Sequence, residues 1–201
     1  MVSRMDELLE HIAVLEKQLE AEFSDARARL HYRIDAGRVR FAREVRQAHR
    51  QIRQSVPQFL IDSSLRNMLT APFVYSLIVP VVILDLWVSV YQAICFRFYG
   101  IARVRRSAYI VIDRQHLAYL NTIEKLNCVY CGYVNGVFAY VREIAGRTEQ
   151  YWCPIRHATR VRAPHPQYRH FVDYGDAEAY RTRLLPLRKD LRDPAKTDDR
   201  S

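Results

Sequence analysis

The sequence lacks the short motifs by which the common enzyme classes are recognised. It contains no glycine-rich phosphate loop, no dinucleotide-binding fingerprint and no paired nucleophile and base. A Glu-x-x-His pair is also missing, which argues against a carboxylate-rich metal site built from His116, Glu124, Glu143 and Glu149. The sequence therefore gives no positive indication of an enzyme.

Lysine is scarce as well. The formal net charge of +9 is the difference between 31 basic and 22 acidic residues, and among the basic ones only Lys17, Lys125, Lys189 and Lys196 are lysines. The planar guanidinium of arginine suits bidentate contact with phosphate, so anionic lipid headgroups and nucleic acid are the candidate partners. An arginine-preferring genome, together with basic flanks around a membrane segment, would give the same composition.

A secretory leader is not apparent at the start of the sequence. The residues MVSRMDELLEHI are charged and lack the apolar stretch of a signal peptide. Four cysteines without such a leader argue against a secreted disulfide scaffold and favour the reducing cytosol. We therefore expect these cysteines to be thiols or metal ligands.

One long stretch is almost free of charge. Residues 70–96, TAPFVYSLIVPVVILDLWVSVYQAICF, contain Asp85 as their only charged residue, and from Asn67 the run is long enough to enter a bilayer. Each Val, Ile, Leu or Phe favours insertion by a few tenths of a kcal/mol, against about 3 kcal/mol opposed by Asp85. The sequence predicts a membrane segment over residues 67–99, in which Asp85 needs a partner or water.

Two membrane arrangements fit the length of this run: a single tilted span, or a re-entrant helical hairpin bent near Pro80. Arginines flank it on both sides, which favours the hairpin because a single span must export one basic arm. The alternative is a buried helix of a soluble protein. A chain of this size would have difficulty covering so long an apolar run.

The arm before this run, residues 1–66, shows helical periodicity. Met5, Leu8, Ile12, Leu15 and Leu19 recur at spacings of three and four, as in an amphipathic or coiled-coil helix. We expect the helix to continue to Val56, where Pro57 should end it. A short hairpin around residues 35–37 is the competing interpretation. Either form makes this arm a membrane-surface element or a contact for a protein partner or second copy.

The segment after Gly100 is predicted to form a small helical module over residues 100–185. Residues 107–112 have strand character, and Asp113 can cap a helix that runs through Leu126. A second helix is expected over residues 137–145, with Gly146 as its stop. These helices would form a hairpin with a pair of cysteines at its turn.

Four residues of this module have the types and spacings of a metal site. Cys128-x2-Cys131-Gly132 is typical of a zinc or rubredoxin knuckle, and Cys153-Pro-x2-His157 supplies a second pair. Three thiolates and an imidazole suit structural Zn²⁺, with an iron-sulfur cluster as the alternative; unligated cysteines and a redox dithiol are the other interpretations. The site requires a turn near Gly146, because a straight helix would hold the two pairs about 30 Å apart.

Aromatic residues and arginines alternate beyond His157. Such a pattern can bind nucleic acid by stacking, but packing of a small domain is the preferred interpretation, so a nucleic-acid partner is not expected. A helix is predicted over residues 176–185. The charged tail with Pro186 and Pro194, residues 186–201, is predicted to be disordered.

The segments IVP…LDL…YQ…CF and YIVIDRQHLAYLN…EKLNCVYCGY…REIA…TEQYWCPIRHA resemble an uncharacterised family of bacterial membrane-associated proteins. The resemblance covers residues 71–158. It implies a location at the bacterial inner (cytoplasmic) membrane and carries over no activity and no ligand set.

The sequence as a whole predicts a mainly α protein. An amphipathic N-terminal helical arm precedes an apolar membrane helix or re-entrant hairpin, which a small metal-stapled cytosolic module follows. The predicted function is a membrane-anchored scaffold or adaptor with a structural zinc site. The alternatives are a membrane-bound redox or iron-sulfur protein and a nucleic-acid-binding module.

Overall fold

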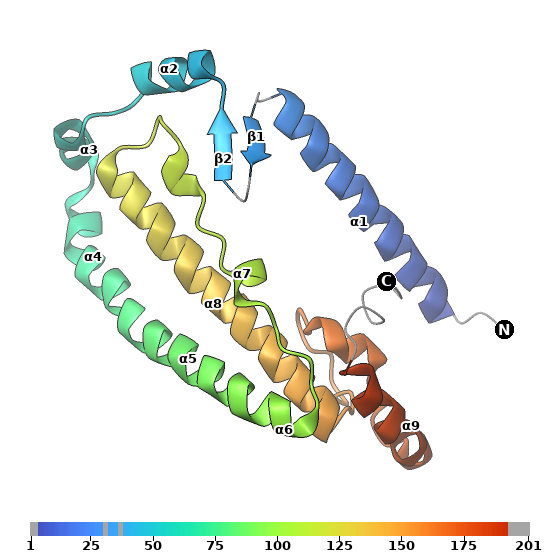
Figure 1. Cartoon of the computed structure of the whole chain (residues 1–201). Helices are drawn as coiled ribbons and strands as arrows, with labels where there is room; N and C mark the ends of the chain where they lie inside the picture. Colours follow the sequence, from blue (N-terminus) through green and yellow to red (C-terminus); the bar gives the residue numbers. More distant parts are fainter. Residues whose placement is uncertain (1–3, 30–31, 36–37, 193–201) are drawn as a thin grey trace. The chain divides into compact units, whose positions relative to one another are not determined.

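The computed structural model describes residues 4–29, 32–35 and 38–192 and is mainly helical, as the sequence predicts (Figure 1). Two compact units are present: the first contains residues up to Ala71 and Ile112–Tyr130, and the second begins with Pro72–Val111 and resumes at Cys131. The elements are α1 (Arg4–Arg29), β1 (Tyr32–Asp35), β2 (Arg38–Phe41), α2 (Arg43–Gln51), α3 (Val56–Asp62), α4 (Leu65–Ser76), α5 (Ile78–Tyr91), a π-helix (Gln92–Phe96), α6 (Arg97–Tyr99), α7 (Arg106–Tyr109), a 3-10 helix (Arg114–His116), α8 (Thr122–Trp152), a second 3-10 helix (Pro166–His170) and α9 (Ala177–Asp190).

The N-terminal arm forms a helix and then a hairpin, not the single long helix expected. β1 and β2 pair antiparallel, with Tyr32 opposite Phe41 and Asp35 opposite Arg38. The alternation of apolar and polar residues therefore outweighs the helix-favouring residues on either side, because a two-residue connection allows the strands to pair. The expected continuous helix to Val56 is therefore wrong over the two strands, although Arg43–Gln51 is helical as α2.

Two helix starts in the first unit differ from prediction. Pro57 lies in the first turn of α3, and Ser55, the N-cap of this helix, accepts a hydrogen bond from the Gln58 amide at 3.4 Å. Pro57 therefore begins a helix and does not end one. The long helix α8 begins at Thr122, not after Asp113. A capping box explains this start: the Asn121 side chain accepts from the Glu124 amide (3.0 Å), and Glu124 accepts from the Asn121 amide (2.7 Å).

The apolar run forms a succession of helical segments over Leu65–Tyr99. This stretch is long and apolar enough to cross a membrane. Leu77, between α4 and α5, keeps a right-handed helical backbone, and Pro80 lies in the first turn of α5, where a missing amide donor is tolerated. The chain therefore does not reverse near Pro80, and the re-entrant hairpin is not formed. The helix ends at Gly100, which has φ +67°.

The predicted helical hairpin of residues 117–145 is replaced by one continuous helix, α8, of 31 residues. Gly146 does not stop the helix. It lies where the chain packs closely: a Cβ at this position would lie 2.5 Å from Gln167 Oε1 and 2.6 Å from His165 Nδ1. Likewise a Cβ on Gly136 would lie 2.8 Å from the Ile110 Cα. These glycines are sites of close approach within a helix, not turns.

The remaining predictions for the second unit are met in part. Residues 107–112 contain the short helix α7 and no strand. α9 begins as expected, with Asp176 accepting from the Ala179 amide at 2.8 Å, but it continues through Pro186 to Asp190. Leu187 and Leu191 are buried, so the tail predicted to be disordered is helical and packed as far as these residues. Residues 193–201 lie outside the described residues.

Candidate functional site

The two faces of the helix formed by α5, the π-helix and α6 have different surroundings. Its inner face contains Val81, Asp85, Gln92 and Phe96, which are all buried in the second unit. The opposite side carries large apolar side chains that remain between 46% and 84% exposed. We call them the outer face: Val79, Val82, Ile83, Leu86, Trp87, Val90, Ile94 and Phe98.

Asp85, the one charge predicted to need a partner, finds two partners on the inner face. Arg106 donates to both carboxylate oxygens, from Nε at 3.1 Å and from a terminal nitrogen at 2.6 Å, and the Tyr133 hydroxyl donates at 2.8 Å. The Asp85 side chain is 10% exposed, whereas the Arg106 side chain is 48% exposed. Bidentate, charge-assisted bonds of this kind offset the cost of burying a carboxylate.

This cluster changes the proton affinity of both partners. Hydrogen bonding to Asp85 is the main cause that holds the pKa of the Arg106 guanidinium above its usual range. Burial, followed by the hydrogen bond to Asp85, raises the pKa of the Tyr133 phenol. The cluster therefore holds a cation and a neutral phenol at ordinary pH, and its chemistry is that of a structural tie between helices.

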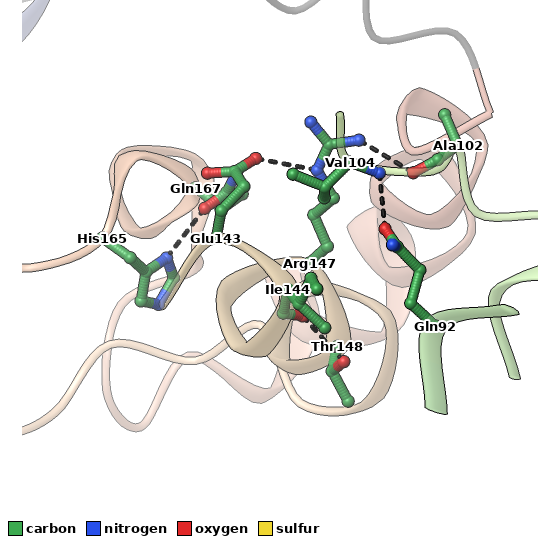
Figure 2. A network of polar contacts seen from close by, with 9 residues as sticks. All are labelled: Gln92, Ala102, Val104, Glu143, Ile144, Arg147, Thr148, His165 and Gln167. Carbon is green, nitrogen blue, oxygen red and sulfur yellow. Dashed lines mark hydrogen bonds and ion pairs between the residues drawn. The ribbon is translucent and has the colours of Figure 1, made fainter. Parts of the chain in front are cut away.

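Gln92 ties the inner face to the segment that follows the helix. Its amide nitrogen donates to the Tyr140 hydroxyl at 2.7 Å. Its amide oxygen accepts from the Val104 backbone amide at 2.5 Å (Figure 2). Asp85 pairs with Tyr133 and Gln92 with Tyr140, so α5 and α8 run side by side in the same direction. The residues around these bonds form an apolar core of Phe96, Ile101, Val104, Tyr140, Ile144 and Leu191.

A second polar network lies on α8 (Figure 2). Glu143 accepts from Arg147 Nε and from the Gln167 side-chain amide, both at 2.7 Å, and Arg147 donates to the Ala102 carbonyl at 2.8 Å. His165 lies 2.9 Å from Glu149. A cavity of about 150 Å³ adjoins this network, but its lining supplies no paired nucleophile and base. The network connects α8 to the segments on either side and contains no catalytic arrangement.

The four predicted metal ligands lie on or just beyond α8. Cys128 and Cys131 are within the helix and Cys153 follows its last residue, so the helical rise separates Cys131 from Cys153 by about 33 Å. His157 packs its ring against Tyr168, with ring centroids 6.2 Å apart. Within residues 4–29, 32–35 and 38–192, no group of three or more His, Cys, Asp or Glu side chains could hold a metal ion.

The predicted metal site is therefore not formed, because the chain does not turn at Gly146. Local spacing suggested a Cys-x2-Cys-Gly turn, yet Gly132 is buried within α8. All four cysteines are free thiols. The short sequence motif is compatible with a helix as well as with a knuckle, and the helix forms.

The inner face was missed at the sequence level, although the sequence contains a signal for it. Asp85 and Gln92, the polar residues of α5 and the π-helix that become buried, are seven positions apart and so share one side of a helix. That side could be recognised as the packed one. No family model, curated protein or solved structure matches this chain.

Proposed function

We propose that this chain is a membrane-attached scaffold or adaptor protein whose outer face contacts the lipid bilayer. The location that we propose is the cytosolic side of a bacterial inner membrane. Membrane attachment is supported by the physical character of the surface, and the location by the resemblance of residues 71–158 to bacterial membrane-associated proteins; the proposal assigns no catalytic step.

The exposed apolar outer face is the observation that carries the proposal. Soluble monomers seldom expose a contiguous apolar surface of this kind, and burying one large apolar side chain is favourable by about 1.5–3 kcal/mol. Trp87 is 73% exposed and Phe98 is 84% exposed. The only charge between Ile78 and Phe96 is Asp85, which is turned inward and paired. The outer face is thus suited to a medium without water.

Positive charge adjoins this apolar surface. Arg97, Arg103 and Arg105 are exposed and lie at or just after the end of the helix. Near an anionic leaflet, each such arginine contributes about 1 kcal/mol of attraction. The combination of an apolar face and adjacent arginines supports a bilayer that contains anionic lipid.

The adaptor part of the proposal rests on α1. Ile12, Leu15, Leu19 and Phe23 recur at helical spacing and are each about half exposed. An apolar stripe of this type buries itself against a second helix, and the occupant that we propose is α1 of a second copy of the chain. Substitution of Leu15 and Leu19 by Asp should convert a crosslinkable dimer into a monomer in detergent. A monomeric wild-type chain would contradict this part alone.

Two leucines of matched exposure test membrane attachment. Leu86 on the outer face is 68% exposed, and Leu185 on α9 is 64% exposed. Burial of one large apolar side chain is favourable by about 1.5–3 kcal/mol, so Leu86→Glu should lower vesicle binding of the full chain by roughly 10- to 100-fold. Leu185→Glu should bind as the wild type does. Wild-type protein that stays unbound when vesicles are floated would refute the proposal.

A further inference from the structure

We propose that α5, the π-helix and α6 lie in the plane of the membrane as a monotopic element, with the outer face in the headgroup and acyl boundary, and do not cross the bilayer. This inference rests on the proposed membrane attachment and adds its geometry. The occupant of the outer face is the surface of a bilayer that contains anionic lipid.

The first reason is that one side of this helix is already covered by protein. α5 is apolar around most of its circumference, so its two faces differ in what they contact and not in hydropathy. The inner face carries Asp85 and Gln92 and packs on protein, whereas the outer face is open, and a crossing helix would have to take this protein layer into the bilayer with it. The polar residues on the inner face are bonded to Arg106, Tyr133, Tyr140 and Val104. The inner face is therefore filled by the chain itself.

The second reason is the depth at which charge would lie in a crossing helix. Asp85 is about 21 Å from Tyr99 at the helical rise, which in a crossing helix ending at Tyr99 places it about 9 Å inside the opposite boundary of a hydrocarbon layer of about 30 Å. Arg106, held there by two hydrogen bonds, has a side chain that is 48% exposed. A half-exposed guanidinium inside the hydrocarbon layer is costly, by up to about 3 kcal/mol or more at the bilayer centre. If the helix lies in the plane of the membrane, the guanidinium of Arg106 remains on the side of the helix that faces water.

The third reason is the irregular segment that runs back beside the helix. Val104 is held by Gln92 and Arg106 by Asp85, so the segment of residues 101–110 passes beside the helix that precedes it, and at Ile110 it touches Gly136 of α8. Arg103 and Arg105 are exposed on this segment, which contains only the short helix α7. Lipid-exposed irregular backbone does not occur in the hydrocarbon region. This segment fits the headgroup layer or water, as the in-plane orientation requires.

Tryptophan depth measurements distinguish the two orientations. The sequence has two tryptophans, so Trp152→Phe leaves Trp87 as the sole probe. Val79→Trp and Phe98→Trp, each made with both natural tryptophans replaced by Phe, place probes near the two ends of the outer face. These sites are 60% and 84% exposed, and the new side chains therefore do not disturb the core. Leu185→Trp in the same background is the control away from the outer face.

The full-length proteins are mixed with phosphatidylcholine vesicles that contain phosphatidylglycerol and lipids brominated at shallow or deep acyl positions. In the plane, the three outer-face probes share one depth of about 5–10 Å into the boundary. Shallow bromines should then quench all three more strongly than deep ones, with ratios that agree within twofold, and Leu185→Trp should not be quenched.

A crossing helix gives a different pattern, because Val79 and Phe98 are separated by about 28 Å along the axis. Deep bromines would then quench Trp87 most, and shallow bromines would quench the two end probes. That result overturns the in-plane orientation and leaves membrane attachment intact. Absence of quenching at all three positions, with protein that does not float with vesicles, refutes attachment itself.

Discussion

The two helices α5 and α8 run in the same direction side by side, but they differ in which of their residues are buried and which are exposed to water. α5 is the more apolar of the two, and yet much of its surface is open; of its residues only Val81 and Asp85 are buried. α8 carries charges in its first turn and after Val141, and it buries nine residues, among them Glu143 and Gln150. Burial in this protein therefore does not follow hydropathy. The apolar surface of α5 remains available for contact outside the chain, and paired polar groups help to hold the core.

The largest effect is expected from two phenylalanines near the end of this helix. Phe96 is completely buried on the inner face, and Phe98 is 84% exposed on the outer face. Phe96→Ala should lower the free energy of unfolding by about 3–5 kcal/mol through loss of apolar contacts and formation of a cavity. Phe98→Ala should change it by less than about 0.5 kcal/mol. Chemical denaturation in a mild detergent measures both; equal losses would remove the distinction between the faces.

A smaller effect is expected from the buried ion pair. Asp85→Ala leaves the Tyr133 hydroxyl and the Arg106 guanidinium without their acceptor, and should cost about 2 kcal/mol, because water compensates part of the loss at the half-exposed arginine. The control is Asp173→Ala, whose carboxylate is 75% exposed and pairs with Arg156. That surface pair should contribute at most about 1 kcal/mol. A larger loss from Asp173→Ala would show that the buried pair is not the important one.

The glycines of α8 give a third comparison, between backbone and side-chain contacts. A methyl group at Gly136 meets the backbone of Tyr109 and Ile110, whereas one at Gly146 meets the side chains of Gln167 and His165, which can move. Gly136→Ala should therefore destabilise by about 1–3 kcal/mol. For Gly146→Ala, the gain in helix propensity of about 1 kcal/mol offsets much of the strain. Thermal unfolding of the two variants tests the order, and the reverse order would contradict the close approach at Gly136.

The smallest effect concerns the predicted metal ligands. Since α8 separates Cys131 from Cys153 by about 33 Å, purified protein should contain substoichiometric zinc and iron, and Cys153→Ser should not alter either. Elemental analysis of protein prepared with and without added Zn²⁺ measures this. One ion per chain, lost in Cys153→Ser, would show that α8 breaks in solution and would restore the four-ligand site.

Sequence patterns predicted the features that depend on local chemistry. The apolar run, the helical periodicity of residues 5–19 and the helix that starts near Asp176 each follow from neighbouring residues, and the structure contains all three as helices. The hairpin of β1 and β2 was recognised but ranked second, because propensity and alternation gave opposite indications there.

Features that depend on distant contacts were not predictable from the sequence. Gly146 is indistinguishable from a helix stop until the His165–Gln167 turn is seen to pack on it. The same holds for Pro186, which lies within α9 because Leu187 and Leu191 gain burial beyond it. The partner of Asp85 is found 21 residues further along the chain, and no local pattern identifies it.

The π-helix at Gln92–Phe96 has a consequence for the angular register of the chain. A π-turn widens the spiral and delays its rotation by about one residue, or roughly 100°. If these five residues adopted the ordinary α pitch with none removed, Arg97–Tyr99 would rotate around the axis by that amount. Deletion of a single residue there, such as Ile94, would instead restore the ordinary pitch and keep Arg97–Tyr99 in their present orientation. The extra residue of the π-turn is thus accommodated without turning the exposed side chain of Phe98 away from the other residues of the outer face.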